Sequence, residues 1–411
     1  MAQAGYLTQF TSLMDIANLV NGRQFTTYIN DVVAPYQTNI RKTDGFRPLP
    51  LKRPYDMTYA AIQRDTRIGI MANHIALDAK AKPRGTKGFT ALEGTIPHIG
   101  ANRTMGKEDY LMAAKVLEST SNSQPIQQSA QMMLYDMLGG NGNSFFPNSP
   151  QMGMYAEHGN RISYMRDQGV SNGYYEITEA NNDGSFTGIK FNYNIPTINR
   201  TTLSGTKRWW TDADRKIEGA DSTPLEDLRN ELFEKARKKN LRKEMMLIEV
   251  EYNTFFSFLR HSKVRASVAS YLYPTIADKT IRTDMIAGWN ETRMKQIVEE
   301  ILGITFIVSD TIVAIEKFNK TKGILEDVSL DSFTPDTFVL RPKGDIGEIH
   351  STSHIMLGGN TSDSMQALSE GGRILTTYTL NLRENIQIWD TEETTLMVLT
   401  AGKSMFYLNV K

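Results

Sequence analysis

The chain has 411 residues, more than one hydrophobic core usually organises, so two or three substructures are expected. Its 46 basic and 46 acidic side chains cancel, which argues against a polyelectrolyte partner such as free nucleic acid or anionic lipid. The sequence contains no cysteine, which excludes disulfides, thiol nucleophiles and iron–sulfur ligation. Hydrophobic residues at 40% and charged residues at 22% are ordinary globular values, so the chain is expected to fold.

A membrane partner is not expected. The most apolar stretch, residues 301–308, stops well short of the roughly 20 residues that a spanning helix needs. The N-terminus also lacks the basic region and apolar run of a secretory signal, which predicts a protein made inside the cell.

Residues 1–60 are predicted to be an N-terminal arm. Prolines occur at positions 35, 48, 50 and 54, and they favour extended backbone over a self-contained core. Such a composition suits a segment that lies over a neighbouring molecule.

Residues 61–105 are predicted to form an extended β-hairpin with a basic, glycine-marked tip at residues 80–88. From Arg64 to Lys107 there are eight basic and three acidic residues, which gives a net charge of +5. Because unpaired charge is costly away from water, the tip either stays solvated or docks on an acidic partner. The predicted inter-subunit contacts are Lys80, Lys82, Arg84, Lys87 and Arg103.

Residues 106–222 are predicted to be a peripheral domain. Apolar residues at helical spacing over 107–138 indicate a long spine helix, broken near Pro125. From Arg161 to Trp210 the period changes to two, which predicts strands, and residues 181–184 (Asn-Asn-Asp-Gly) predict a hairpin turn.

Residues 223–374 are predicted to be an inserted α/β axial domain. A Thr-Pro-Leu-Glu capping box at residues 223–226 starts one helix, and Asn290 and Gly303 bracket another before the strand at 304–308. Residues 375–411 return to strands and are predicted to close the sheet of the peripheral domain.

No residue pattern specifies an enzyme or a cofactor. His350 and His354 are the one close histidine pair, but nearby glycines oppose the helix that a metal pair would favour. The basic run at residues 235–243 could bind phosphate, although basic residues are also common at the end of a helix. Catalytic, cofactor and metal sites are therefore not expected.

The order of these parts resembles the major capsid proteins of tailed double-stranded DNA phages, which have the Hong Kong 97-type fold, and in particular the lambda-type family. The segments that carry this resemblance are residues 69–78 with 97–100, 209–212 with 223–228, 333–340, and 379–399. It implies an α+β fold with an arm, an extended hairpin loop, a spine helix in a peripheral domain and an axial domain. It also implies a virion protein that assembles in the host cytoplasm into hexamers and pentamers around packaged DNA.

The partners implied are further copies of the chain, together with portal, scaffold and decoration proteins, and DNA held by enclosure and weak contact. The region 139–222 is longer than is usual in the family, and no helical scaffold segment is seen in the arm, which favours a separate scaffold protein or none. Two alternatives stay open: an encapsulin-like nanocompartment shell, and a metal-dependent hydrolase using His350 and His354. A nucleic-acid-binding module ranks below these, because the net charge is zero.

Overall fold

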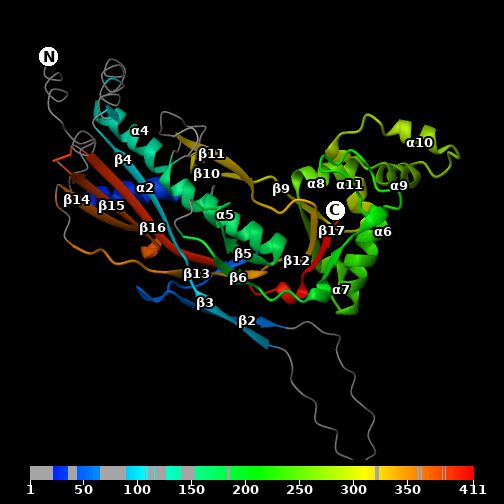
Figure 1. Cartoon of the computed structure of the whole chain (residues 1–411), viewed down its shortest axis with the longest axis horizontal. Helices are drawn as coiled ribbons and strands as arrows, with labels where there is room; N and C mark the ends of the chain where they lie inside the picture. Colours follow the sequence, from blue (N-terminus) through cyan, green and yellow to red (C-terminus); the bar gives the residue numbers. More distant parts are fainter. Residues whose placement is uncertain are drawn as a thin grey trace, which may run out of the picture.

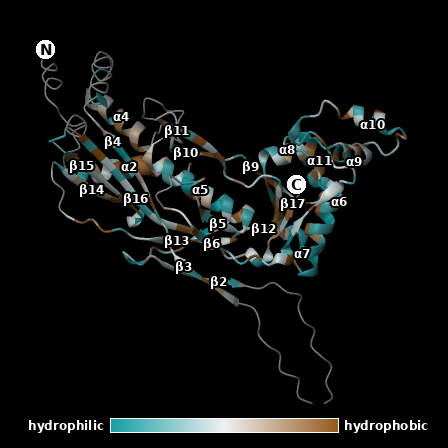
Figure 2. Cartoon of the chain, viewed as in Figure 1, coloured by the Kyte–Doolittle hydropathy of each residue, from teal (hydrophilic) through white to brown (hydrophobic). Residues whose placement is uncertain are grey.

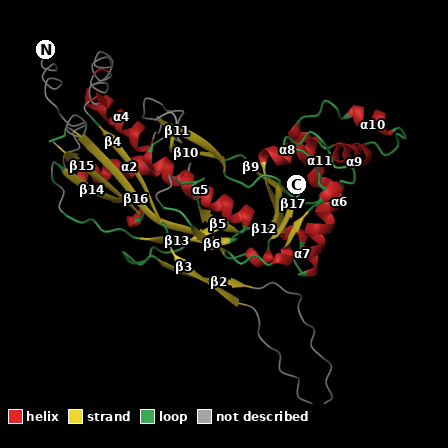
Figure 3. Ribbon diagram, viewed as in Figure 1, coloured by secondary structure: helices red, strands yellow, loops and turns green. Residues whose placement is uncertain are grey.

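The computed structural model describes residues 22–35, 44–64, 89–106, 108–109, 115, 126–139, 153–182, 186–319, 324–358, 361, 363–381, 383–384 and 386–411. In this part of the chain helices and strands mix in two lobes side by side, with most strands in one lobe and most short helices in the other (Figure 3). The expected α+β class is confirmed. No described helix is long and apolar enough to cross a membrane.

The first lobe, called the platform here, is built on a six-stranded sheet. Its main order is β1-β13-β16-β15-β14, and β4 pairs with β16. The strands are β1 (Phe46–Pro48), β4 (His98–Met105), β13 (Gly347–Thr352), β14 (Ser364–Ser369), β15 (Ile374–Asn381) and β16 (Ile386–Leu399). The 14-residue β16 is the central strand: residues 387–393 pair with β15 along one edge and with β4 along the other, and residues 394–399 pair with β13.

Three helices pack on the platform: α2 (Gly22–Pro35), α4 (Ile126–Gly139) and α5 (Met154–Asn172). In Figure 1, α4 and α5 follow one another across the sheet. Apolar residues of α2, including Phe25 and Ile29, share a core with Leu134 of α4 and Trp389 of β16. Part of the predicted arm is thus a helix packed within its own chain.

The prediction of strands from Arg161 onward is wrong over residues 161–172, because α5 is a helix of 19 residues. Its buried residues include charged and polar side chains, among them His158, Arg166 and Asp167, as well as apolar ones. A helix buried on most sides shows no one-sided apolar stripe, so the helical period is hidden in its sequence. The described parts of the predicted spine helix are α4 and the helical residues 108–109 and 115.

The second lobe, called the α/β lobe here, has a five-stranded sheet of order β7-β17-β12-β8-β9. The strands are β7 (Arg200–Thr202), β8 (Met246–Glu251), β9 (Phe306–Ser309), β12 (Thr337–Pro342) and β17 (Phe406–Asn409). The helices are α6 (Pro224–Asp227), a π-helical turn (Leu228–Phe233), α7 (Glu234–Lys238), α8 (Tyr252–Arg260), α9 (Ser262–Leu272), α10 (Lys279–Met285) and α11 (Glu291–Leu302). One aromatic core, with Trp209, Phe258 and Phe338 in ring contact, holds this lobe together.

Strand pairing corrects the expected domain boundaries. β13 and β14 fall within 223–374 but belong to the platform sheet, whereas β17 falls within 375–411 but pairs with β12 and β7 of the α/β lobe. β7 and the buried Trp209–Trp210 pair also belong to that lobe, although they precede residue 223. The α/β lobe is therefore assembled from three separate stretches of sequence.

Three two-stranded ribbons complete the described fold. They are β2 (Thr58–Arg64) with β3 (Phe89–Thr95), β5 (Tyr174–Ile177) with β6 (Ile189–Asn192), and β10 (Ile312–Asn319) with β11 (Ile324–Asp331). The β5–β6 pair confirms the hairpin predicted around residues 181–184. Residues 98–105, which were placed in the basic hairpin, instead form β4 of the platform sheet. Short 3₁₀ turns occur at 197–199, 205–207, 243–245, 370–372 and 402–404.

Candidate assembly surfaces

The β2–β3 ribbon is rooted in the platform. Tyr59, Ala61 and Leu92 alternate with exposed neighbours along its strands and enter the platform core. The buried side-chain amide of Gln63 donates to the carbonyl of Tyr193 at 2.9 Å, and Lys403 Nζ donates to Thr90 Oγ1 at 2.6 Å. The ribbon therefore leaves the platform in a fixed direction, toward one long side of the molecule (Figure 1).

The predicted contact residues at the hairpin tip, Lys80, Lys82, Arg84 and Lys87, lie outside the described residues. They fall in the stretch between Arg64 and Phe89, the last residue pair of the ribbon, so β2 and β3 carry this basic segment. Their contact with other subunits stays a prediction.

Arg103 has a different position from the tip residues. It lies on β4, and its guanidinium forms an ion pair with Glu157 of α5, with both side chains partly exposed. Burial raises the pKa of Glu157, Arg103 opposes that rise, and nearby Glu316 adds to it. The charge of Arg103 is thus engaged within its own chain.

A buried charge cluster joins the two lobes. Arg166 of α5 contacts Glu249 of β8 and is 2.8 Å from Asp167, and Arg341 of β12 contacts the same Glu249. These four side chains are at most 3% exposed. Burial alone would raise the pKa of Glu249, but the two guanidinium groups hold it below its usual value.

Sequence reasoning missed this cluster because its members lie far apart along the chain. Glu249 is 83 residues from Arg166 and 92 residues from Arg341. The one local signal is a glutamate at the centre of the buried strand β8, since a carboxylate at such a position requires a cationic partner.

His350 and His354 do not form a metal site with other described residues. His350 lies 5.7 Å from the Tyr59 ring and 3.4 Å from Glu348, whereas the His354 ring packs at a tilt against His98, with 5.9 Å between ring centres. No group of three potential metal ligands occurs in the described part of the chain.

The basic run at residues 235–243 is partly explained by contacts within the chain. Lys235 pairs with Glu231 at 3.0 Å, Arg237 with Glu234 at 2.7 Å, and Lys239 donates to Asn199 at 2.8 Å. Figure 2 shows this helix as mostly hydrophilic. Arg242 and Lys243 follow the helix and are exposed.

Large apolar side chains are exposed in both lobes. In the platform they include Tyr55, Ile355 and Leu357, which are 68%, 44% and 73% exposed. In the α/β lobe Tyr271, Ile281 and Met285 are about half exposed. Exposed apolar side chains that cluster on a soluble protein commonly mark contact surfaces.

Comparison with known proteins gives matches at the level of solved structures. No protein-family model matches the chain, and no curated protein sequence matches it. A putative capsid protein of a prophage from E. coli CFT073 has 10% sequence identity and a TM-score of 0.49, over 95% of this chain and 99% of that one. The chain is thus similar to a phage capsid protein.

Two further solved structures are similar over most of their length. The mature capsid of bacteriophage PhiM1 has 11% identity and a TM-score of 0.42, over 90% of this chain and 86% of that chain. A phage-related protein from Bordetella bronchiseptica RB50 has 11% identity and a TM-score of 0.40, over 93% and 96%.

Proposed function

We propose that this chain is a major capsid protein, a self-assembling subunit of the icosahedral head shell of a tailed phage, which encloses packaged double-stranded DNA. The observation that carries the proposal is the division of the molecule into two lobes side by side, each with its own core and each with exposed apolar side chains. A wall subunit gains its stability from neighbouring copies, which cover such side chains in the assembly.

The partners follow from this role. Copies of the chain would form hexamers and pentamers, with the basic tip at residues 80–88 on an adjacent copy. Portal, scaffold and decoration proteins would join the shell, and the virion would form in the host cytoplasm. Because basic and acidic residues balance, DNA would be held by enclosure and by weak, salt-sensitive contact.

The experiment is expression of the chain alone, followed by size-exclusion chromatography and negative-stain electron microscopy. We expect closed, roughly spherical particles that elute far ahead of a 46.3 kDa monomer. A purified protein that stays monomeric at high concentration, with or without a co-expressed scaffold, would contradict the proposal.

A further inference from the structure

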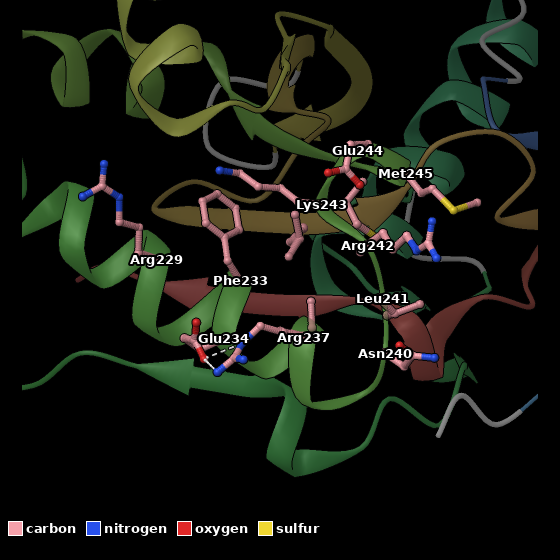
Figure 4. A pocket seen from close by; sticks show the side chains of 13 residues that line it. Arg229, Phe233, Glu234, Arg237, Asn240, Leu241, Arg242, Lys243, Glu244 and Met245 are labelled. Atoms are coloured by element: carbon pink, nitrogen blue, oxygen red, sulfur yellow. Dashed lines mark hydrogen bonds and ion pairs between the residues drawn. The ribbon is translucent and has the colours of Figure 1, made fainter. Parts of the chain in front are cut away.

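A basic recess with an apolar floor lies in the α/β lobe, between the end of α7 and the start of β8. Its volume is about 950 Å³. In Figure 4, Phe233 and Leu241 lie within the recess, while Arg229, Arg242 and Lys243 surround them and Met245 lies at one side. This basic recess is large enough for two or three side chains of a partner.

The recess carries an excess of positive charge. Four basic residues line it, namely Arg229, Arg237, Arg242 and Lys243, against the two acids Glu234 and Glu244, a net charge of +2. Lys243 Nζ lies 4.9 Å from the centre of the Phe233 ring, where it is partly withdrawn from water. Partial burial lowers the pKa of Lys243, and the positive charge of Arg229 lowers it further.

Charge and apolar surface occur together in this recess. A duplex backbone would satisfy the cations but would leave the apolar floor without a partner. Met245 at the rim is 65% exposed, and Phe233 and Leu241 below it are partly buried. A polypeptide segment that presents acidic and apolar side chains together fits both features.

Strand β11 of the same chain presents acidic and apolar side chains together. Its eight residues include three acids, Glu326, Asp327 and Asp331, and no base, so its charge is −3. Ile324 and Val328 on this strand are 52% and 36% exposed. On the paired strand β10, Lys317 donates its ammonium to the carbonyl of Glu179.

The basic recess and strand β11 lie on opposite long sides of the molecule. In Figure 1 the β10–β11 ribbon is on the upper side with α10, whereas α7 is on the lower side, the side toward which β2–β3 leaves. A contact between opposite sides of identical copies is heterologous, and repetition of it closes a ring when the rotation allows.

Helices α9 and α10, which also lie on the upper side, have the wrong charge. Helices α9 and α10 together contain four bases, Lys263, Arg265, Lys279 and Arg282, against one acid, Asp284. Their net charge of +3 would be repelled by the basic recess. Among the described elements of that side, β11 is the acidic one with exposed apolar side chains.

We propose that β11 of one copy enters the basic recess of a neighbouring copy by the edge that does not pair with β10. Asp327 and Asp331, on one face of the strand, then contact Arg242 and Lys243, and Val328, on the opposite face, lies against Met245. This contact rests on the proposed function only in that both need association between copies. It assigns the recess to assembly and gives the ring of copies a direction.

Cysteine cross-linking tests this contact, because the natural chain has no cysteine to interfere. A Met245→Cys copy and a Val328→Cys copy, carrying different tags, are co-expressed and then oxidised. We expect a disulfide-linked dimer that contains both tags. Pairing Val328→Cys with Ile198→Cys is the matched control, since Ile198 is 74% exposed and does not line the recess.

Charge reversal is the second part of the experiment. Arg242→Glu with Lys243→Glu in the Met245→Cys copy should lower the yield of mixed dimer by about tenfold or more, because like charges then face each other. Asp327→Lys with Asp331→Lys in the Val328→Cys copy should restore the yield.

A mixed dimer no more abundant than the Ile198 control, or a yield that charge reversal leaves unchanged, would overturn the docking proposal. Electron microscopy of the natural protein separates this result from the proposed function. Closed particles without the cross-link leave the shell intact and remove the docking contact. A specific cross-link without particles keeps the contact and removes the shell.

Discussion

Glu249 is the residue on which the connection between the two lobes depends. Its carboxylate is fully buried and is shared by Arg166 of the platform and Arg341 of the α/β lobe. Each ion has lost its water, so the cluster is stable only while every charge keeps a partner.

Replacement of Glu249 by Gln should therefore destabilise the chain strongly. The change leaves the buried Arg341 guanidinium without a carboxylate and the Arg166 guanidinium with Asp167 alone, and we expect a loss of about 3–5 kcal/mol in the free energy of unfolding. Urea denaturation followed by tryptophan fluorescence measures it. The matched control is Glu234→Gln, which removes an exposed pair with Arg237 and should change stability little. Equal effects of the two substitutions would contradict the assigned role of Glu249.

Three histidines are expected to make the folded chain sensitive to mild acid. Burial lowers the pKa of His261, His350 and His354 below the ordinary histidine value. For His261 the structural reason is visible, since its neutral Nδ1 accepts the backbone N–H of Lys263 at the start of α9.

Protonation of these histidines should lower the free energy of unfolding. Near the ordinary histidine pKa of about 6.5 the unfolded chain binds more protons than the folded chain, so the free energy of unfolding falls as pH falls. Denaturation midpoints measured between about pH 7.5 and 5.5 should decrease. In His261→Gln the decrease should be smaller. A midpoint that rises toward pH 5.5 would refute this reading.

At the scale of elements, the sequence predicts those whose signals are local. Asn290 accepts from the backbone N–H of Arg293, and Gly303 ends α11 in a left-handed conformation, as the capping pattern indicated. The Thr223 capping box is only partly present, because the Thr223 hydroxyl donates to Asp227 instead of accepting from the backbone.

Elements whose character depends on long-range packing were not predictable in this way. Helix α5 was read as strands because burial of most of its surface removes the amphipathic pattern. Strand β17 lies in a segment that the sequence predicts as strands, whereas β13 and β14 lie within the predicted α/β domain, and local pattern does not say which sheet a strand joins. For the same reason the Glu249 cluster, built from α5, β8 and β12, could not be foreseen.

The β2–β3 ribbon is the element expected to control assembly through its tip. Reversal of Lys80, Lys82 and Arg84 to Glu should leave the chain folded but abolish normal particles, because the tip would then repel the acidic groups on which it docks. Negative-stain microscopy counts the particles, and circular dichroism checks the fold.

A matched control reverses Lys207, Arg208 and Lys216, three exposed basic residues of the α/β lobe. This variant has the same net charge as the tip variant, so it separates the position of the charge from its amount. Normal particles from the tip variant would rule out the proposed role of the ribbon.

At the scale of the whole molecule, the two lobes carry different features that the proposed shell would use. The platform carries the ribbon and the long sheet, while the α/β lobe carries the recess, α10 and the chain's C-terminal strand (Figure 1). The buried Glu249 cluster sets how one lobe meets the other. In a closed shell the α/β lobes would surround the local symmetry axes, with the platforms farther out.

The most direct test of the central claim is a cryo-electron microscopy reconstruction of the particles formed by the unaltered chain. The account predicts an icosahedral shell in which α/β lobes surround the axes of pentamers and hexamers, and each β2–β3 ribbon extends over an adjacent copy. Particles without icosahedral order, or a shell with the α/β lobes away from every symmetry axis, would contradict it.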